Sequence, residues 1–220
     1  MARKQPAQAR QVKDKAPAAS KPKRRQANPP AKPGAATVFT LKITLERVKP
    51  AIWRRVQTKD CTLAKLHDII QNSMGWYDMH LHVFRIGDEE YGLPDQWTDP
   101  GGWDEVEVGD SRKVKLSQLA TRGIKKFRYE YDMGDGWQHT IQFEKPVSEE
   151  PDVKYPRCVA GARACPPEDC GGPWGYGDIV EAMQNPKHER HGELLEWLGR
   201  PFDAEAFNSK IADQALRARH

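Results

Sequence analysis

The sequence predicts an α+β fold: a single compact domain with an antiparallel or mixed sheet, one early helix and a C-terminal helical segment. Apolar residues alternate with polar ones in 37–48 and again in 127–143, which is the period of half-buried strands. Apolar residues at helical spacing occupy 62–75 and most of the chain after 177. A chain of 220 residues is long enough for one sizeable core.

The first ordered segment is predicted to be a strand that starts at Thr37. Its alternating apolar positions end at Leu45, and an extended segment resumes over 51–56. Ile52 and Trp53 interrupt the alternation there, which predicts a bulge. Thr62 is a suitable N-cap for the early helix, and Gly75 is suited to close it.

A strand is predicted over 80–86, with His80 and His82 on one face, where two imidazoles could share a metal. The strands at 127–131 and 137–144 flank a Gly-Asp-Gly turn, which predicts a hairpin. Three helices follow, predicted to begin at Asp178, at Asn185-Pro186 and at Asp203.

The charge is unevenly distributed along the chain. Residues 1–34 hold ten Lys and Arg against one acid, a net +9, whereas 35–220 hold 25 bases and 30 acids, a net −5. We expect 1–34 to be a disordered tail, because it has almost no large apolar residue, and 35–220 to be the folded domain. The tail is either a solubilising segment or an arm that binds DNA or RNA phosphates. The bases proposed for this arm are Lys21, Lys23, Arg24 and Arg25.

No apolar run approaches the roughly 20 residues that cross a bilayer, and no apolar segment follows the basic N-terminus. We therefore expect a cytoplasmic protein with no membrane contact. The segment 86–111 has nine acids and no Lys or Arg. It is predicted to be a solvent-exposed hairpin and loop, and it is also a candidate contact surface for a protein partner.

The candidate metal ligands are three late cysteines and one histidine of the hairpin: Cys158, Cys165, Cys170 and His139. In a reducing compartment free thiols or a metal site are favoured over disulfides, and glycines nearby would let the backbone fold round a zinc ion. Paired C-x-x-C is absent, and buried cysteines are also common as core residues. Zinc is therefore one candidate cofactor.

A second cluster gathers carboxylates and a histidine from the hairpin and the loop after it: Asp132, Asp135, His139, Glu168 and Asp169. Such a set could hold Mg²⁺, or could act as acid and base on a phosphodiester. The alternative is structural, because Asp in a Gly-rich turn commonly bonds its own backbone.

Five motifs occur in order at 41–56, 66–76, 80–84, 129–141 and 165–176. Together they resemble the plasmid Ri ORF-three-like family, also labelled the TnpR passenger protein of an insertion element. The resemblance covers about Thr37 to Phe207 and implies a compact α+β fold with an association with plasmids and mobile elements. It implies no established activity, and neither the serine nor the tyrosine recombinase pattern is present in this chain.

Three hypotheses about function follow. The first is a mobile-element module that binds nucleic acid or a nucleoprotein partner without catalysis. The second is a metal-dependent enzyme that acts on a phosphodiester through the region of Asp132, His139 and Cys158 to Cys170. The third is a protein–protein adaptor that uses 86–111.

Overall fold

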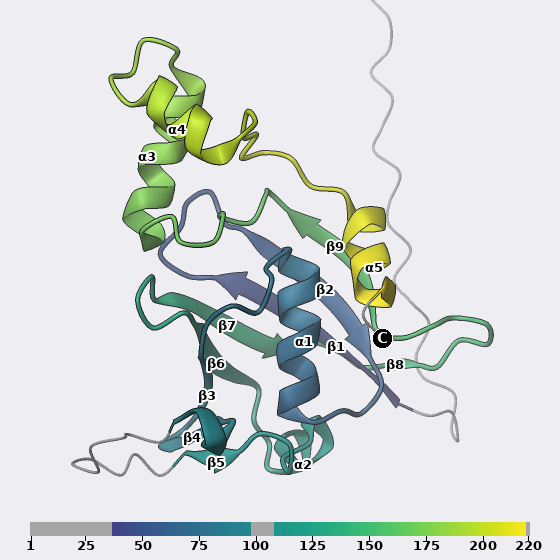
Figure 1. Cartoon of the computed structure of the whole chain (residues 1–220). Coiled ribbons are helices and arrows are strands. Elements are labelled where there is room, and N and C mark those ends of the chain that lie inside the picture. The colour runs from purple at the N-terminus through teal and green to yellow at the C-terminus, as the bar shows by residue number, and fades with distance from the viewer. Residues whose placement is uncertain (1–36, 98–107, 219–220) are drawn as a thin grey trace, which may run out of the picture.

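The computed structural model describes residues 37–97 and 108–218, and there nine strands form one sheet with helices packed around it (Figure 1). The strand order is β5-β4-β3-β6-β7-β1-β2-β9, and β8 pairs with β1. All neighbouring strands are antiparallel except β4 and β5. The α+β prediction of one compact domain is confirmed.

The strands are β1 (Thr37–Leu45), β2 (Trp53–Thr58), β3 (His82–Ile86), β4 (Glu89–Gly92), β5 (Gly109–Asp110), β6 (Lys126–Tyr131), β7 (Trp137–Phe143), β8 (Val147–Ser148) and β9 (Arg157–Ala162). The helices are α1 (Leu63–Met74), the 3₁₀ turn η1 (Pro94–Gln96), α2 (Leu116–Thr121), α3 (Gly172–Gln184), α4 (His191–Leu198) and α5 (Ser209–Ala218).

Helix α1 has the predicted ends. The hydroxyl of Thr62 accepts a hydrogen bond from the Lys65 N–H at 3.2 Å, and Gly75 closes the helix in the left-handed conformation. The helix lies across one face of the sheet (Figure 1), and its apolar stripe is fully buried. Each fully buried Leu or Ile of that stripe stabilises the fold by about 1.5–3 kcal/mol.

The β6–β7 hairpin is confirmed, and its aromatic residues form the centre of the core. Tyr129, Tyr131 and Trp137 are completely buried. The bulge predicted near Ile52 lies instead between Arg55 and Val56, where β2 pairs with β9. Strand β9 itself was not predicted, because its sequence is short and rich in small residues.

The predicted helix starts near the C-terminus are wrong. Helix α3 begins at Gly172, six residues before Asp178, because left-handed Gly171 and the early Pro173 start it. Helix α4 begins at His191, beyond a turn in which Asn185 accepts a hydrogen bond from the Lys187 N–H. The last helix, α5, begins at Ser209.

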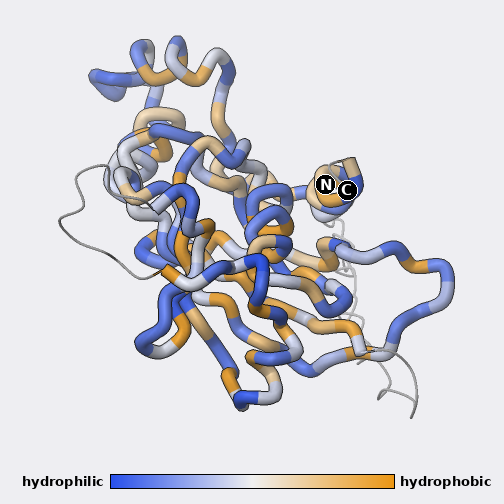
Figure 2. The backbone as a smooth tube through the Cα atoms, turned by 60° about the horizontal axis from the view of Figure 1, so that its bottom comes forward, coloured by the Kyte–Doolittle hydropathy of each residue, from blue (hydrophilic) through white to orange (hydrophobic). Residues whose placement is uncertain are grey.

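Hydrophobic segments follow the strands and α1, whereas the loop that joins β8 to β9 projects from the body and is mostly hydrophilic (Figure 2). Helix α5 packs beside α1 and against β9 (Figure 1). Across residues 37–97 and 108–218, no helix has the length and apolar character needed to cross a bilayer.

Candidate metal centre

Three loops meet at one end of the sheet. They are the loop after α1 (75–81), the β6–β7 turn (132–136) and the loop between β9 and α3 (163–171). Strand β3 pairs antiparallel with β6 so that His82 lies opposite Tyr131. Residues just before β3 and just after β6 therefore lie at the same end of the sheet, which brings His80 next to Asp132.

His80, Asp132 and Asp169 form a cluster whose ligand atoms all lie within 4.8 Å of one another. His80 Nε2 is 3.6 Å from Asp132 Oδ2 and 3.1 Å from Asp169 Oδ1. The side chain of Asp132 is 9% exposed and that of Asp169 is 62% exposed, so the cluster extends from a buried carboxylate to the protein surface. Within the described residues this is the one His/Cys/Asp/Glu group with the spacing of a metal site.

The backbone holds Asp132 in place. Its N–H donates to the carbonyl of Leu81 at 2.9 Å, and its φ of 57° lies in the left-handed region, which Asp tolerates better than most residues. Asp132 Oδ1 accepts the N–H groups of Gly134 and Asp135 at 3.0 and 3.2 Å. The turn thus uses one carboxylate oxygen and leaves Oδ2 directed toward His80.

Glu168 connects the loops behind the cluster. Its Oε1 accepts the Tyr77 N–H at 2.9 Å and the Tyr131 hydroxyl at 3.0 Å. The same Tyr131 hydroxyl accepts the Met79 N–H at 3.0 Å. The residues before His80 and before Asp169 are therefore tied to one buried phenol, and Glu168 Oε2 is buried without a hydrogen-bond partner.

Asp135 joins the turn to the start of α3. Its Oδ2 accepts the N–H of Gly171, and a Cβ on Gly172 would lie 2.4 Å from the Asp135 carbonyl oxygen. A Cβ on Gly175 would lie 1.8 Å from the carbonyl oxygen of Cys170. These glycines let the N-terminus of α3 pack against the loop that carries Asp169.

The predicted catalytic residues are thus mostly brought together, with one exception. Asp132 and Asp169 are in the cluster, while Asp135 and Glu168 support the surrounding loops. His139 is not among them. It shares the buried face of β7 with Trp137 and Ile141, is itself completely buried, and its ring centroid lies 5.3 Å from that of Trp76. Burial lowers the pKa of His139 to about 4.

The three late cysteines and His139 are not brought together as one ligand set. Cys158 lies on β9, where its N–H donates to Asp213 of α5. Desolvation is the main reason that the pKa of the Cys170 thiol is raised to about 12, and nearby Asp135, Glu168 and Asp132 raise it further. Burial is also the main reason that the pKa of the Cys165 thiol is raised.

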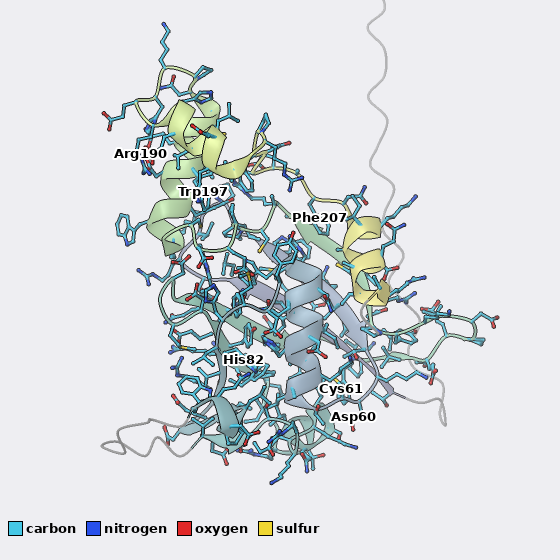
Figure 3. All side chains as sticks on the ribbon, viewed as in Figure 1. Asp60, Cys61, His82, Arg190, Trp197 and Phe207 are labelled. Atoms are coloured by element: carbon cyan, nitrogen blue, oxygen red, sulfur yellow. The ribbon has the colours of Figure 1, made fainter. Side chains whose placement is uncertain are left out.

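The sequence pattern places His80 and His82 on one face of a strand, but the structure separates them. His80 lies before β3, while His82 is buried at 2% exposure and stacks on His67 at 3.6 Å between ring centroids (Figure 3 shows His82 beside α1). The pairing of β3 with β6 places His80 beside Asp132.

Two other predicted surfaces lie wholly or partly outside the described residues. They are the basic group Lys21, Lys23, Arg24 and Arg25, and residues 98–107 of the acidic segment 86–111.

The fold and the cluster define a class of protein: an α+β domain with a single large, mainly antiparallel sheet and a carboxylate–imidazole cluster at one end of it. Residues 37–211 match the family described as plasmid pRiA4b ORF-3-like protein, and the chain belongs to that family. It is 39% identical over 183 residues to the uncharacterized protein y4hQ of Sinorhizobium fredii, a match that covers 82% of this chain and 91% of that one.

A solved structure has the same fold. The crystal structure of the protein of unknown function MM3350 from Methanosarcina mazei Go1 is similar with a TM-score of 0.70 and 35% sequence identity. The likeness covers 79% of this chain and 96% of that one. The likeness therefore extends over most of the chain, beyond a local motif.

Proposed function

We propose that His80, Asp132 and Asp169 bind a divalent cation and that the chain catalyses metal-dependent hydrolysis of phosphate esters. The observation that carries the proposal is the mutual approach of three ligand atoms within 4.8 Å around the buried carboxylate of Asp132. Three protein ligands leave coordination positions open, as in catalytic rather than structural metal sites.

The donor set fits a small group of ions. Carboxylate oxygens suit Mg²⁺ and Mn²⁺, and imidazole suits Zn²⁺ and other transition ions. A mixed set of two carboxylates and one imidazole is therefore best probed with Mn²⁺ and Zn²⁺. When bound, the cation supplies positive charge that polarises a phosphoryl oxygen and promotes ionisation of water.

The surroundings favour an anionic substrate. Helix α3 has 13 residues and begins three residues after Asp169, with Gly171 as its N-cap, so the positive end of its dipole lies beside the cluster. Helix N-termini are common binding places for phosphate groups. The net +9 of residues 1–34 supplies further attraction for a polyanion.

The test is a metal-binding and activity assay on the variant Asp132→Asn. Asn keeps the oxygen that accepts the two turn N–H groups and tolerates the left-handed backbone, so the fold should survive while the charged ligand is lost. We expect Mn²⁺ binding by calorimetry and hydrolysis of bis(p-nitrophenyl) phosphate in the parent chain, and neither in the variant.

Asp152→Asn is the matched control, because it makes the same chemical change at an exposed residue of the loop between β8 and β9, outside the cluster. It should keep at least about half of the activity and bind Mn²⁺ normally. The absence of metal binding in the parent chain, or equal activity in Asp132→Asn, would overturn the proposal.

The second candidate function is nucleic-acid binding without catalysis, and it rests on the ten Lys and Arg of residues 1–34. Phosphate neutralisation predicts a salt-dependent, sequence-independent gel shift that disappears when residues 1–34 are deleted. Full binding by the deleted chain would exclude this role for the basic segment.

A further inference from the structure

A large cavity adjoins the metal cluster. Its volume is about 930 Å³, within the range of sites for small organic ligands, and it lies between the C-terminal end of α1, the loop 164–168 and the segment 198–215. Met79 and Glu168 line it, and they directly precede His80 and Asp169. The cavity and the cluster therefore share two loops.

The cavity walls are mainly apolar and partly aromatic. Trp76, Phe202 and Phe207 line it, together with Met74. Phe207 is held firmly: the Arg54 guanidinium lies 4.5 Å from its ring centroid, and the same ring packs so closely on Gly161 that a Cβ there would lie 2.5 Å from it. Figure 3 shows Phe207 near the C-terminal end of α1 and beside α5. Such a wall suits a flat ring.

Two polar side chains that line the cavity, Glu168 and Arg200, could orient a ligand in it. Glu168 Oε2 is buried without a partner, while Oε1 is occupied by Tyr77 and Tyr131. A buried carboxylate oxygen without a donor is costly, so a ligand that brings an N–H group offsets that cost. Exposed Arg200 also lines the cavity and adds positive charge for a phosphate.

We propose that this cavity binds the nucleobase of a nucleotide whose phosphate lies at the His80–Asp132–Asp169 cluster. A flat heteroaromatic ring with an N–H donor, attached to a phosphate, matches the aromatic walls, the free oxygen of Glu168 and the adjoining cluster together. The inference rests on the proposed function, because the phosphate end depends on the metal site.

The test measures binding of adenosine 5′-monophosphate to the full-length chain loaded with Mn²⁺. Glu168→Gln can keep an oxygen for Tyr77 and Tyr131 while placing an amide N–H₂ where Oε2 was, so a base amino group would then face a donor. We expect about tenfold weaker nucleotide binding in Glu168→Gln when both forms are saturated with Mn²⁺. Glu189→Gln, the same change at an exposed acid away from the cavity, should bind like the parent.

A second variant fills the cavity. Ala206 lines it and is exposed, so Ala206→Trp places a large side chain inside without disturbing the core. It should also weaken adenosine 5′-monophosphate binding at least tenfold, whereas ribose 5-phosphate, which lacks the base, should bind weakly to every form. Nucleotide binding that neither variant changes would overturn the cavity assignment and leave the metal site standing. If the parent chain does not bind Mn²⁺, that result would instead refute the proposed function.

Discussion

The backbone N–H of Tyr77 donates a hydrogen bond of 2.9 Å to Oε1 of Glu168, although the two residues are 91 positions apart. This bond joins the loop that carries His80 to the loop that carries Asp169. The cluster of His80, Asp132 and Asp169 is consequently held by a hydrogen-bonded layer behind it, in which Tyr131 is the common member. Such supporting layers orient ligands and tune their affinity.

Tyr131→Phe tests that layer. The change removes the hydroxyl that donates to Glu168 and accepts from Met79, without altering the ring that packs in the core. We expect about 10–100-fold weaker Mn²⁺ binding, from the looser ligand loops. The free energy of unfolding should fall by about 1–3 kcal/mol, because buried partners are left unsatisfied. Calorimetry and urea unfolding measure the two effects; unchanged metal affinity would show that the layer does not position the ligands.

Metal content distinguishes the cluster from the zinc site predicted from the cysteines. Purified protein that carries metal at His80, Asp132 and Asp169 should keep it in Cys165→Ser and lose it in His80→Ala. A site built on Cys158, Cys165, Cys170 and His139 predicts the reverse. Elemental analysis of the two variants beside the parent chain decides between them.

Stability should fall in mild acid because two histidines are buried in the neutral form. Burial lowers the pKa of His82 to about 3 and that of His139 to about 4, from an ordinary 6.5. At pH values between the folded pKa of each histidine and 6.5, the unfolded chain binds more protons than the folded chain. The stabilisation is therefore fully present above about pH 6.5 and is lost as the pH falls toward 4.

The slope is at most about 1.4 kcal/mol per pH unit for each histidine. Urea unfolding at several pH values between these limits measures it. A stability that does not vary across this range would contradict the neutral assignment of the two histidines.

Two glycines of α3 form a matched pair. A Cβ at Gly175 would overlap the carbonyl oxygen of Cys170, whereas a Cβ at Gly177 meets nothing within 4 Å. Gly175→Ala should destabilise the protein by about 1–3 kcal/mol. Gly177→Ala should stabilise it by up to about 1 kcal/mol, because Ala favours the helix. Thermal unfolding of both variants checks the packing of α3 on the Asp169 loop, and equal effects would argue against it.

The thiols should be unreactive in the folded chain. Burial raises the pKa of Cys61 to about 11 and is the largest cause of the shift of Cys170 to about 12. Because the thiolate is the reactive species, Ellman's reagent near pH 8 should label the native protein at least about tenfold more slowly than the unfolded one. Fast labelling of Cys170, identified by mass spectrometry, would show that its loop opens in solution.

Local sequence pattern was sufficient for the elements whose structure depends on their own residues. The cap at Thr62, the closing Gly75 and the alternation in β1 and β6 each specify a boundary or a buried face directly. The C-terminal helices were placed wrongly because Gly171 and Pro173 start α3 earlier than the capping pattern at Asp178 indicates.

The site was predictable in part for a related reason. Residue type and neighbouring turns are enough to select Asp132 and Asp169 as candidates, but placing His80 beside them requires the pairing of β3 with β6, which no local pattern contains. His139 shows the opposite case: its chemistry suggested a ligand, while its position on the alternating strand β7 already indicated the core.

The Tyr77–Glu168 bond means that the cluster is completed late in synthesis. His80 and Asp132 are synthesised before Asp169, and the loop that carries Asp169 is anchored only once Glu168 reaches Tyr77 and Tyr131. A chain cut ahead of this loop would contain two of the three cluster residues and would lack the loop that carries the third. Cation affinity would then report whether the whole domain has been assembled.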